Sequence, residues 1–276
     1  MKPDPPLRSR FQARNIAVPT FLSQITQLKR VAPKVPQRTL ERLISVGFVL
    51  RSVTSEKGVA VPEFPPQLDQ AARILQYFPD TNLRCILDIM YPYPLLSGTD
   101  EEQRSIIEST YQRFDMLGHA VDQAGAMTIA NQATAGYKIV GIIKEEEPSN
   151  VTSTGRIHHA DVTFETIVPL GVKPTQVTVR LPAGEYPSTK LDKFVETEYH
   201  GALLATMMVA HSVGDLCIIG EKGAGKSALL RSLTSFLGYK VELIPLYKDM
   251  SARDLMQRRS TNLLGDTIWE NSPLVC

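Results

Sequence analysis

The stretch IIGEKGAGKSALLRS, residues 218–232, decides how this chain is interpreted. An apolar run leads into a glycine-rich turn that ends in Lys-Ser, and helix-forming residues follow. Gly220, Gly225, Lys226 and Ser227 fit the pattern G-x-x-x-x-G-K-[ST], which is typical of a phosphate-binding loop. In such a loop the glycines let backbone N–H groups surround a phosphate, and the positive end of the next helix faces the same anion.

The motif predicts a site for ATP and a magnesium ion. We expect Lys226 to reach the β- and γ-phosphates and the Ser227 hydroxyl to ligate Mg²⁺. The alternative is a Gly-Lys turn that binds nothing, and the apolar run before the loop favours the nucleotide. The predicted cofactor-binding residues are Gly220, Glu221, Lys222, Gly223, Ala224, Gly225, Lys226 and Ser227.

Two apolar runs flank the loop and predict adjacent strands of a parallel sheet. LCIIG (216–220) comes before it, and KVELIPL (240–246) follows a helix that ends near Leu237 and a turn at Gly238. Strand, loop, helix and strand form one right-handed βαβ unit. Hydrolysis also needs an acid at the end of a neighbouring strand. No acid after Ser227 stands at the end of an apolar run, so the residues predict binding without a visible catalytic acid.

The first half of the chain predicts a compact α-helical unit. Apolar residues recur at helical spacing in four segments, 36–53, 67–78, 81–91 and 101–114. In the third segment Asp88 follows an apolar run, as a metal-binding acid would. Because the helical period places Asp88 on a helix face, we interpret it as structural.

The middle of the chain predicts a linker and then a small β region. Residues 118–136 are rich in alanine and glycine and predict the linker. The segments 137–144, 160–168 and 175–184 are β-branched and partly alternating, which predicts a β-hairpin or small sheet. Residues 191–212 predict an apolar helix that leads to the loop.

Composition limits the class of protein and its possible partners. The chain is 43% hydrophobic and 21% charged with a net charge of +1, which is ordinary for a globular protein and gives no argument for nucleic acid. No apolar run approaches the about 18 residues of a membrane span. Three cysteines outside any C-x-x-C pattern argue against a disulfide framework or zinc site. Residues 1–40 hold eight Lys/Arg against Asp4; a transit peptide, a solvated face and a functional arginine site stay open.

The residues after the loop resemble an AAA+ ATPase module of the midasin, dynein and MoxR type. The resemblance rests on the loop, on the D-x-x-x-x-D-L segment Asp249–Leu255 and on the W-x-x-S-P-L-V segment Trp269–Val275. It implies an α/β fold with an α-helical lid, hydrolysis of Mg-ATP, and oligomeric rings of AAA+ modules or subunits. It also implies a metal-binding acid on a strand shortly after the last segment.

The other end of the chain resembles the close of a preceding AAA+ module. In DPPLRSRFQARN (4–15) the family's L-R-x-R-F motif implies that Arg10 is an arginine finger acting on a neighbouring site, with Arg8 as the rival. The helical unit would then be that module's lid. The stretch PPQLDQAAR lacks the family's sensor arginine at the usual place, and Arg73 lies one turn further on.

The predicted domains follow this resemblance: 1–117, the end of a first module; 118–136, a linker; 137–184, a β-hairpin region; and 185–276, the start of a second module with an incomplete parallel sheet. The resemblance is closest to a large mitochondrial member of the family, which implies a fragment or short isoform and a mitochondrial location. Because no clear targeting peptide is present, a cytoplasmic location stays open.

Three functions follow from these observations. The first is ATP binding as part of an ATPase that hydrolyses ATP. The second is a truncated nucleotide-binding or interaction fragment that does not hydrolyse ATP. The third, a small P-loop kinase or a nucleic-acid NTPase, is weaker because no lid arginine cluster or basic groove follows the loop.

Overall fold

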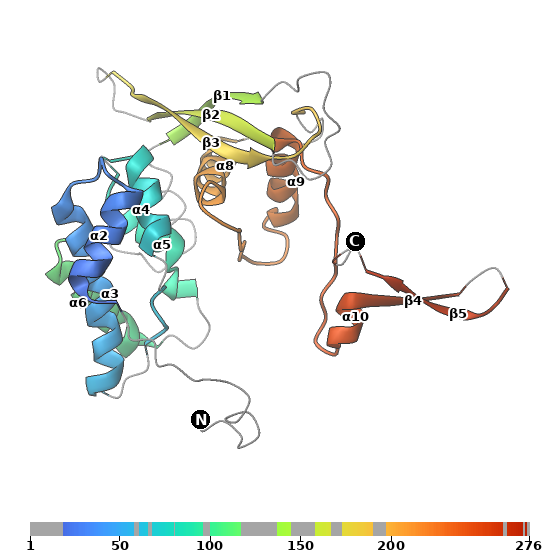
Figure 1. Ribbon diagram of the computed structural model, residues 1–276, viewed down its shortest axis with the longest axis horizontal. Helices are drawn as coiled ribbons and strands as arrows, with labels where there is room; N and C mark the ends of the chain where they lie inside the picture. Colours follow the sequence, from blue (N-terminus) through green and yellow to red (C-terminus); the bar gives the residue numbers. More distant parts are fainter. Residues whose placement is uncertain are drawn as a thin grey trace.

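The computed structural model describes residues 19–57, 61–65, 68–79, 81–95, 100–116, 137–144, 158–166, 173–189, 197–261, 264–272 and 274. Figure 1 shows three parts: a helical unit, a three-stranded sheet that lies over two helices, and a C-terminal hairpin that stands apart from both. The predicted linker 118–136 lies outside the described residues.

The helical unit contains α2 (Phe21–Val31), α3 (Gln37–Lys57), α4 (Leu68–Tyr77), α5 (Leu83–Met90), the 3₁₀ turn η1 (Tyr93–Leu95) and α6 (Glu101–Arg113). The four predicted helices are confirmed as α3 to α6. Their starts follow from local chemistry: the Asn82 side chain caps α5, and Asp100 with Gln103 forms a capping box at α6. Helix α2 was not predicted, although Thr20 accepts a hydrogen bond from Ser23 N as its N-cap.

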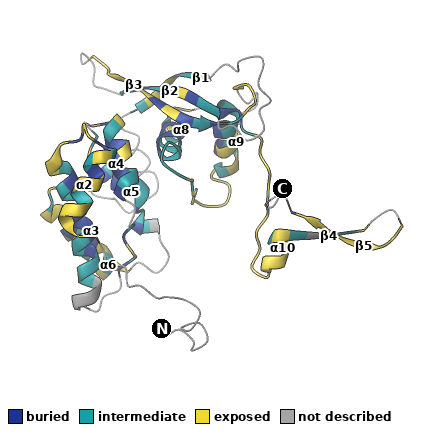
Figure 2. Ribbon diagram, viewed as in Figure 1, coloured by how far each residue is buried: buried dark blue, intermediate teal, exposed yellow. Residues whose placement is uncertain are grey.

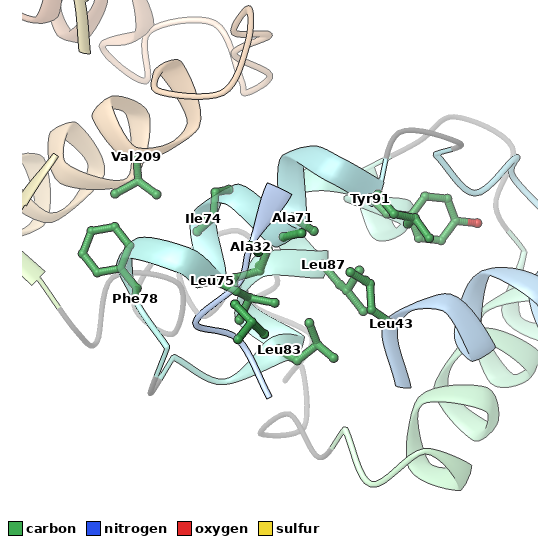
Figure 3. Packing of buried hydrophobic residues seen from close by; sticks show 14 of the residues in the cluster. Ala32, Leu43, Ala71, Ile74, Leu75, Phe78, Leu83, Leu87, Tyr91 and Val209 are labelled. Atoms are coloured by element: carbon green, nitrogen blue, oxygen red, sulfur yellow. The ribbon is translucent and has the colours of Figure 1, made fainter. Parts of the chain in front are cut away.

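One continuous apolar core joins the helical unit to the sheet. Figure 3 shows Leu75 of α4 and Leu87 of α5 turned into the unit, and both are almost completely buried. At the edge of the unit, Phe78 packs against Tyr137 and Phe164, with ring centroids 4.4 and 5.7 Å apart. These aromatic contacts hold the helices against the sheet.

The sheet has the antiparallel order β1-β2-β3, from β1 (Tyr137–Lys144), β2 (His158–Thr166) and β3 (Gln176–Ala183). The predicted small sheet is therefore confirmed. Alternate residues such as Val162 and Val179 are buried on one face, as the two-residue period of a strand requires. Helices α8 (Glu198–His211) and α9 (Lys226–Leu237) lie against the sheet (Figure 1).

The predicted parallel strands around the loop are wrong for this structure. Residues 216–220 and 240–246 take no regular secondary structure, and after α9 the chain runs away from the sheet as a single trace (Figure 1). A strand is stabilised by backbone bonds to a neighbour, and parallel pairs occur mainly in larger sheets covered on both faces. Within the described ranges neither run makes such a pairing.

The C-terminal part contains α10 (Ala252–Met256) and the antiparallel strands β4 (Gln257–Thr261) and β5 (Thr267–Asn271). This hairpin was not predicted. Figure 2 colours most of it as exposed, whereas dark blue gathers in the helical unit and the sheet. None of the helices in the part of the chain that the structure describes is long and apolar enough to cross a membrane.

Candidate functional site

The phosphate-loop motif forms an open turn at the start of α9. Gly223 and Gly225 have φ angles of 90° and 80°, and glycine adopts this left-handed conformation without the steric cost of a Cβ. An added Cβ at either position would meet no atom within 4 Å. The glycines are therefore required by the backbone conformation of the loop rather than by crowding.

Helix α9 begins with its first-turn amides turned toward this loop. Gly225 is the N-cap and has no side chain to bond them, while its carbonyl oxygen accepts from the N–H groups of Ala228 and Leu229, both at 3.0 Å. The first N–H groups of a helix have no partner inside the helix and carry the positive end of its dipole. An anion in the loop would meet these groups.

The Lys226 side chain folds back over the loop. Its Nζ donates to the carbonyl oxygens of Gly220, at 2.8 Å, and Glu221, at 2.5 Å. An added Cβ on Gly220 would lie 3.6 Å from Lys226 Cδ, so the lysine stem runs beside this glycine. The ammonium group is therefore held at the mouth of the loop by two neutral acceptors, which a charged phosphate oxygen could replace.

The predicted site residues are brought together only in part. Residues 220–227 share one loop and the first turn of α9, and Ser227 is exposed there. Arg10 and its rival Arg8 lie outside the described residues. Arg73 is exposed on α4 with Asp69 as its ion-pair partner, at 4.0 Å.

Asp88 and Glu242, which lie at or within apolar runs, are both paired with basic side chains. Asp88 lies on α5 and accepts from Arg84 Nε at 2.8 Å, which agrees with its structural interpretation. Glu242 pairs with Lys240 at 3.0 Å. Among the described residues no group of three or more His, Cys, Asp and Glu side chains is arranged to hold a metal ion.

Sequence reasoning missed the buried charge of Arg84. Its side chain is 4% exposed and forms two bonds to the Glu108 carboxylate, at 2.7 and 2.9 Å, in addition to the bond to Asp88. Its guanidinium carbon also lies 4.4 Å from the centre of the Tyr111 ring. The four-residue spacing of Arg84 and Asp88 was a usable signal, since such pairs meet on one helix face.

These partners shift the pKa values of the cluster. Burial opposes ionisation, but the hydrogen bonds from Arg84 and Tyr93 hold the pKa of Glu108 below its ordinary value. Burial lowers the pKa of Arg84, but Glu108 and Asp88 together outweigh that and raise it. The cluster ties α5 to α6 inside the helical unit and is structural rather than part of the loop.

Comparison with known proteins gives the class. Residues 215–276 match the family model described as the AAA domain of the dynein-related subfamily, and the match begins just before the loop. The last part of the chain therefore matches an AAA domain, the domain that characterises AAA+ ATPases.

One curated relative matches almost the whole chain. Over 275 residues the chain is 34% identical to the mouse von Willebrand factor A domain-containing protein 8, a match that covers 99% of this chain and 13% of the mouse protein. The chain therefore spans about an eighth of the length of this relative. No solved structure gives a significant match.

Proposed function

We propose that residues 220–227 bind ATP with Mg²⁺. The observation that carries this proposal is the open loop with left-handed Gly223 and Gly225, placed at the uncapped start of α9 under the Lys226 ammonium. Backbone N–H groups, a helix dipole and a cation then converge on one point, and each of them favours a phosphate group.

Different residues of the loop would contact different parts of Mg-ATP. The backbone from Glu221 to Gly225 would surround the phosphates, and the first-turn amides of α9 would donate to them. The Lys226 Nζ would leave the carbonyl oxygens of Gly220 and Glu221 for the β- and γ-phosphates. The Ser227 hydroxyl fits a ligand of Mg²⁺, which would bring positive charge to the phosphates.

We further propose that this chain is part of a longer ATPase, in which it joins two AAA+ modules. Residues 1–117 would end the first module with its lid, 118–136 would be a linker, 137–184 a β region and 185–276 the start of the second module. Arg10 would act as an arginine finger on a neighbouring site, because a guanidinium stabilises charge on a γ-phosphate. Partners would be other AAA+ modules or subunits, in a mitochondrial location.

The test is the affinity of the 276-residue chain for Mg-ATP, measured by titration calorimetry. We expect Lys226→Ala to weaken binding by about 10- to 100-fold, the cost of a lost charge-assisted hydrogen bond. Lys248→Ala removes an exposed lysine outside the loop and should change the affinity less than twofold. Equal affinities of Lys226→Ala and the parent chain, or no binding by the parent chain, would contradict the proposal.

The same proteins separate binding from hydrolysis. The alternative function, a fragment that binds nucleotide without hydrolysing it, predicts no steady-state ATP turnover by the purified chain. Glu242, the acid within the run 240–246, is exposed and pairs with Lys240 at 3.0 Å. Turnover that Lys226→Ala abolishes would show instead that the chain carries its own catalytic acid.

A further inference from the structure

The end of α9 opposite the loop is bound by a segment that follows β3, residues 184–189. The last carbonyl groups of a helix have no partner inside the helix. Here three N–H groups of the segment donate to carbonyl oxygens at or next to the end of α9. The bonds run from Gly184 to Leu237 (3.0 Å), from Tyr186 to Gly238 (3.0 Å) and from Thr189 to Ser235 (3.1 Å).

Side chains strengthen the same contact. The hydroxyl oxygens of Thr189 and Ser235 lie 2.7 Å apart, and Ser235 Oγ also donates to the Thr189 carbonyl oxygen at 3.0 Å. These two residues are 46 positions apart in the sequence. The segment is thus bonded to α9 through both its backbone and its side chains.

Lys144, the last residue of β1, adds a positive charge. Its Nζ donates to the Gly184 carbonyl oxygen at 2.6 Å and also to the Tyr186 carbonyl oxygen. A Cβ added to Gly238 would overlap the Lys144 ammonium, so the charge lies against the end of α9. A cation there is favourable because the C-terminal end of a helix carries partial negative charge.

Two glycines let the backbones meet at this distance. A Cβ added to Gly184 would overlap the Gly238 carbonyl oxygen, and one added to Gly238 would overlap the Tyr186 carbonyl oxygen. Gly238 also has a φ angle of 70°, the left-handed conformation of a helix C-terminus. The contact between the segment and α9 therefore depends on glycine on both sides.

We propose that residues 184–189 and Lys144 form a clamp that positions α9 and thereby sets the affinity of the loop for phosphate. Helix α9 has 12 residues, so the clamp and the loop are about 18 Å apart along one rigid element. Phosphate contacts depend on where the first turn lies, and a small displacement of a binding group is costly. This inference rests on the proposed function of the loop.

The clamp is tested first without nucleotide, by hydrogen exchange of the Ala228 and Leu229 amides at the loop end of α9. Lys144→Met keeps the apolar stem and removes the donors, and we expect these amides to exchange several-fold faster than in the parent chain. The matched control is Lys138→Met on the same strand, since Lys138 pairs with Glu165 at 2.7 Å. Equal exchange in the two variants would overturn the clamp.

The second measurement is the affinity for Mg-ATP. We expect Lys144→Met to bind about five- to tenfold more weakly than Lys138→Met, at the low end of the range for coupled sites. Ser235→Ala, a milder change at the same contact, should weaken binding by about two- to fivefold. If Lys144→Met accelerates exchange but binds ATP as tightly as the control, the clamp is only structural and the inference is wrong.

The two proposals fail in different ways. If the parent chain does not bind Mg-ATP, the proposed function of the loop is wrong, and the exchange rates alone decide whether the clamp positions α9. If the parent chain binds Mg-ATP through Lys226 and neither clamp variant alters the affinity, the proposed function of the loop is supported and the clamp proposal is wrong.

Discussion

The helical unit of residues 19–116 and the C-terminal part that follows α9, residues 240–274, use their apolar residues in opposite ways. In the first, Leu75 and Leu87 are buried, whereas in the second Leu243 is 84% exposed and Leu246 is 74% exposed. Helices satisfy their backbone bonds within one segment and need only bury one face. Strands need a partner strand, and the apolar runs around the loop have none among the described residues.

A basic side chain in the helical unit and one in the loop also differ in the kind of partner they bond. Arg84 of the helical unit is enclosed by carboxylates, so a ligand would have to displace charged partners. Among the described residues Lys226 bonds to carbonyl oxygens of its own loop, and these are weaker acceptors than a phosphate. Arg84 is therefore held by charged partners, whereas the Lys226 bonds are to neutral carbonyl groups that a stronger acceptor could replace.

The largest test of this contrast removes one leucine from each region. We expect Leu75→Ala to lower the free energy of unfolding of the helical unit by about 3 kcal/mol, because it leaves a cavity in a closed core. Leu243→Ala removes the same atoms from an exposed site and should cost less than about 0.5 kcal/mol. The measurement is urea unfolding followed by circular dichroism at 222 nm.

Trp269, the one tryptophan of the chain, gives an internal control because it lies in the hairpin. Leu75→Ala should leave the tryptophan emission of the folded protein unchanged while it shifts the helical transition. A similar loss of helical stability in both leucine variants would show that residues 240–246 are packed in solution, and the contrast between the two regions would fail.

Most of the helices could be predicted from the sequence. Apolar spacing and caps such as Asn82 and Asp100 are local signals, and the helices they predict at 36–53, 67–78, 81–91 and 101–114 are present. The loop and α9 were also predicted from local signals, since Gly223, Gly225 and Gly238 take the left-handed conformations that their positions require. Helix α2 was not predicted, although its Thr20 cap is a local signal of the same kind.

Most of what failed depended on contacts between residues far apart in the sequence. The runs 216–220 and 240–246 have the composition of strands, but pairing decides whether a strand forms. The hairpin of β4 and β5 was missed because its residues are mostly polar and exposed. The bonds between residues 184–189 and α9 join positions 46 or more apart, and no local pattern announces them. The roles of residues 220–227 and Arg10 remain predictions.

A smaller test concerns the closed charge cluster of the helical unit. Glu108→Gln should lower the free energy of unfolding at pH 7 by about 1 kcal/mol, a reduced value because the carboxylate is 37% exposed to solvent. Because the pKa of Glu108 is held below its ordinary value, its contribution is present above that value and is lost as the pH falls through the lowered pKa.

The difference in the free energy of unfolding between Glu108→Gln and the parent chain should therefore be constant from pH 6 to 8. It should shrink as the pH falls below about 4. Urea unfolding at a series of pH values measures it. Glu63→Gln, which changes an exposed carboxylate, should show no such dependence. A difference that widens as the pH falls would mean that the ion pair with Arg84 does not stabilise the unit.

The smallest effect is expected in the exposed hairpin, where Arg253 lies over the Trp269 ring with its guanidinium carbon 4.2 Å from the ring centre. Such a contact at an exposed site contributes about 0.5 kcal/mol. Arg253→Gln should therefore increase the exchange of the cross-strand amides of Ser260 and Glu270 about twofold, whereas Arg231→Gln on α9 should leave it unchanged. Because the described residues of β4 and β5 are mostly exposed, this contact should help to order the hairpin. Unchanged exchange in Arg253→Gln would mean that backbone pairing alone holds the hairpin, and that the C-terminal part is less dependent on its side chains than the comparison with the helical unit implies.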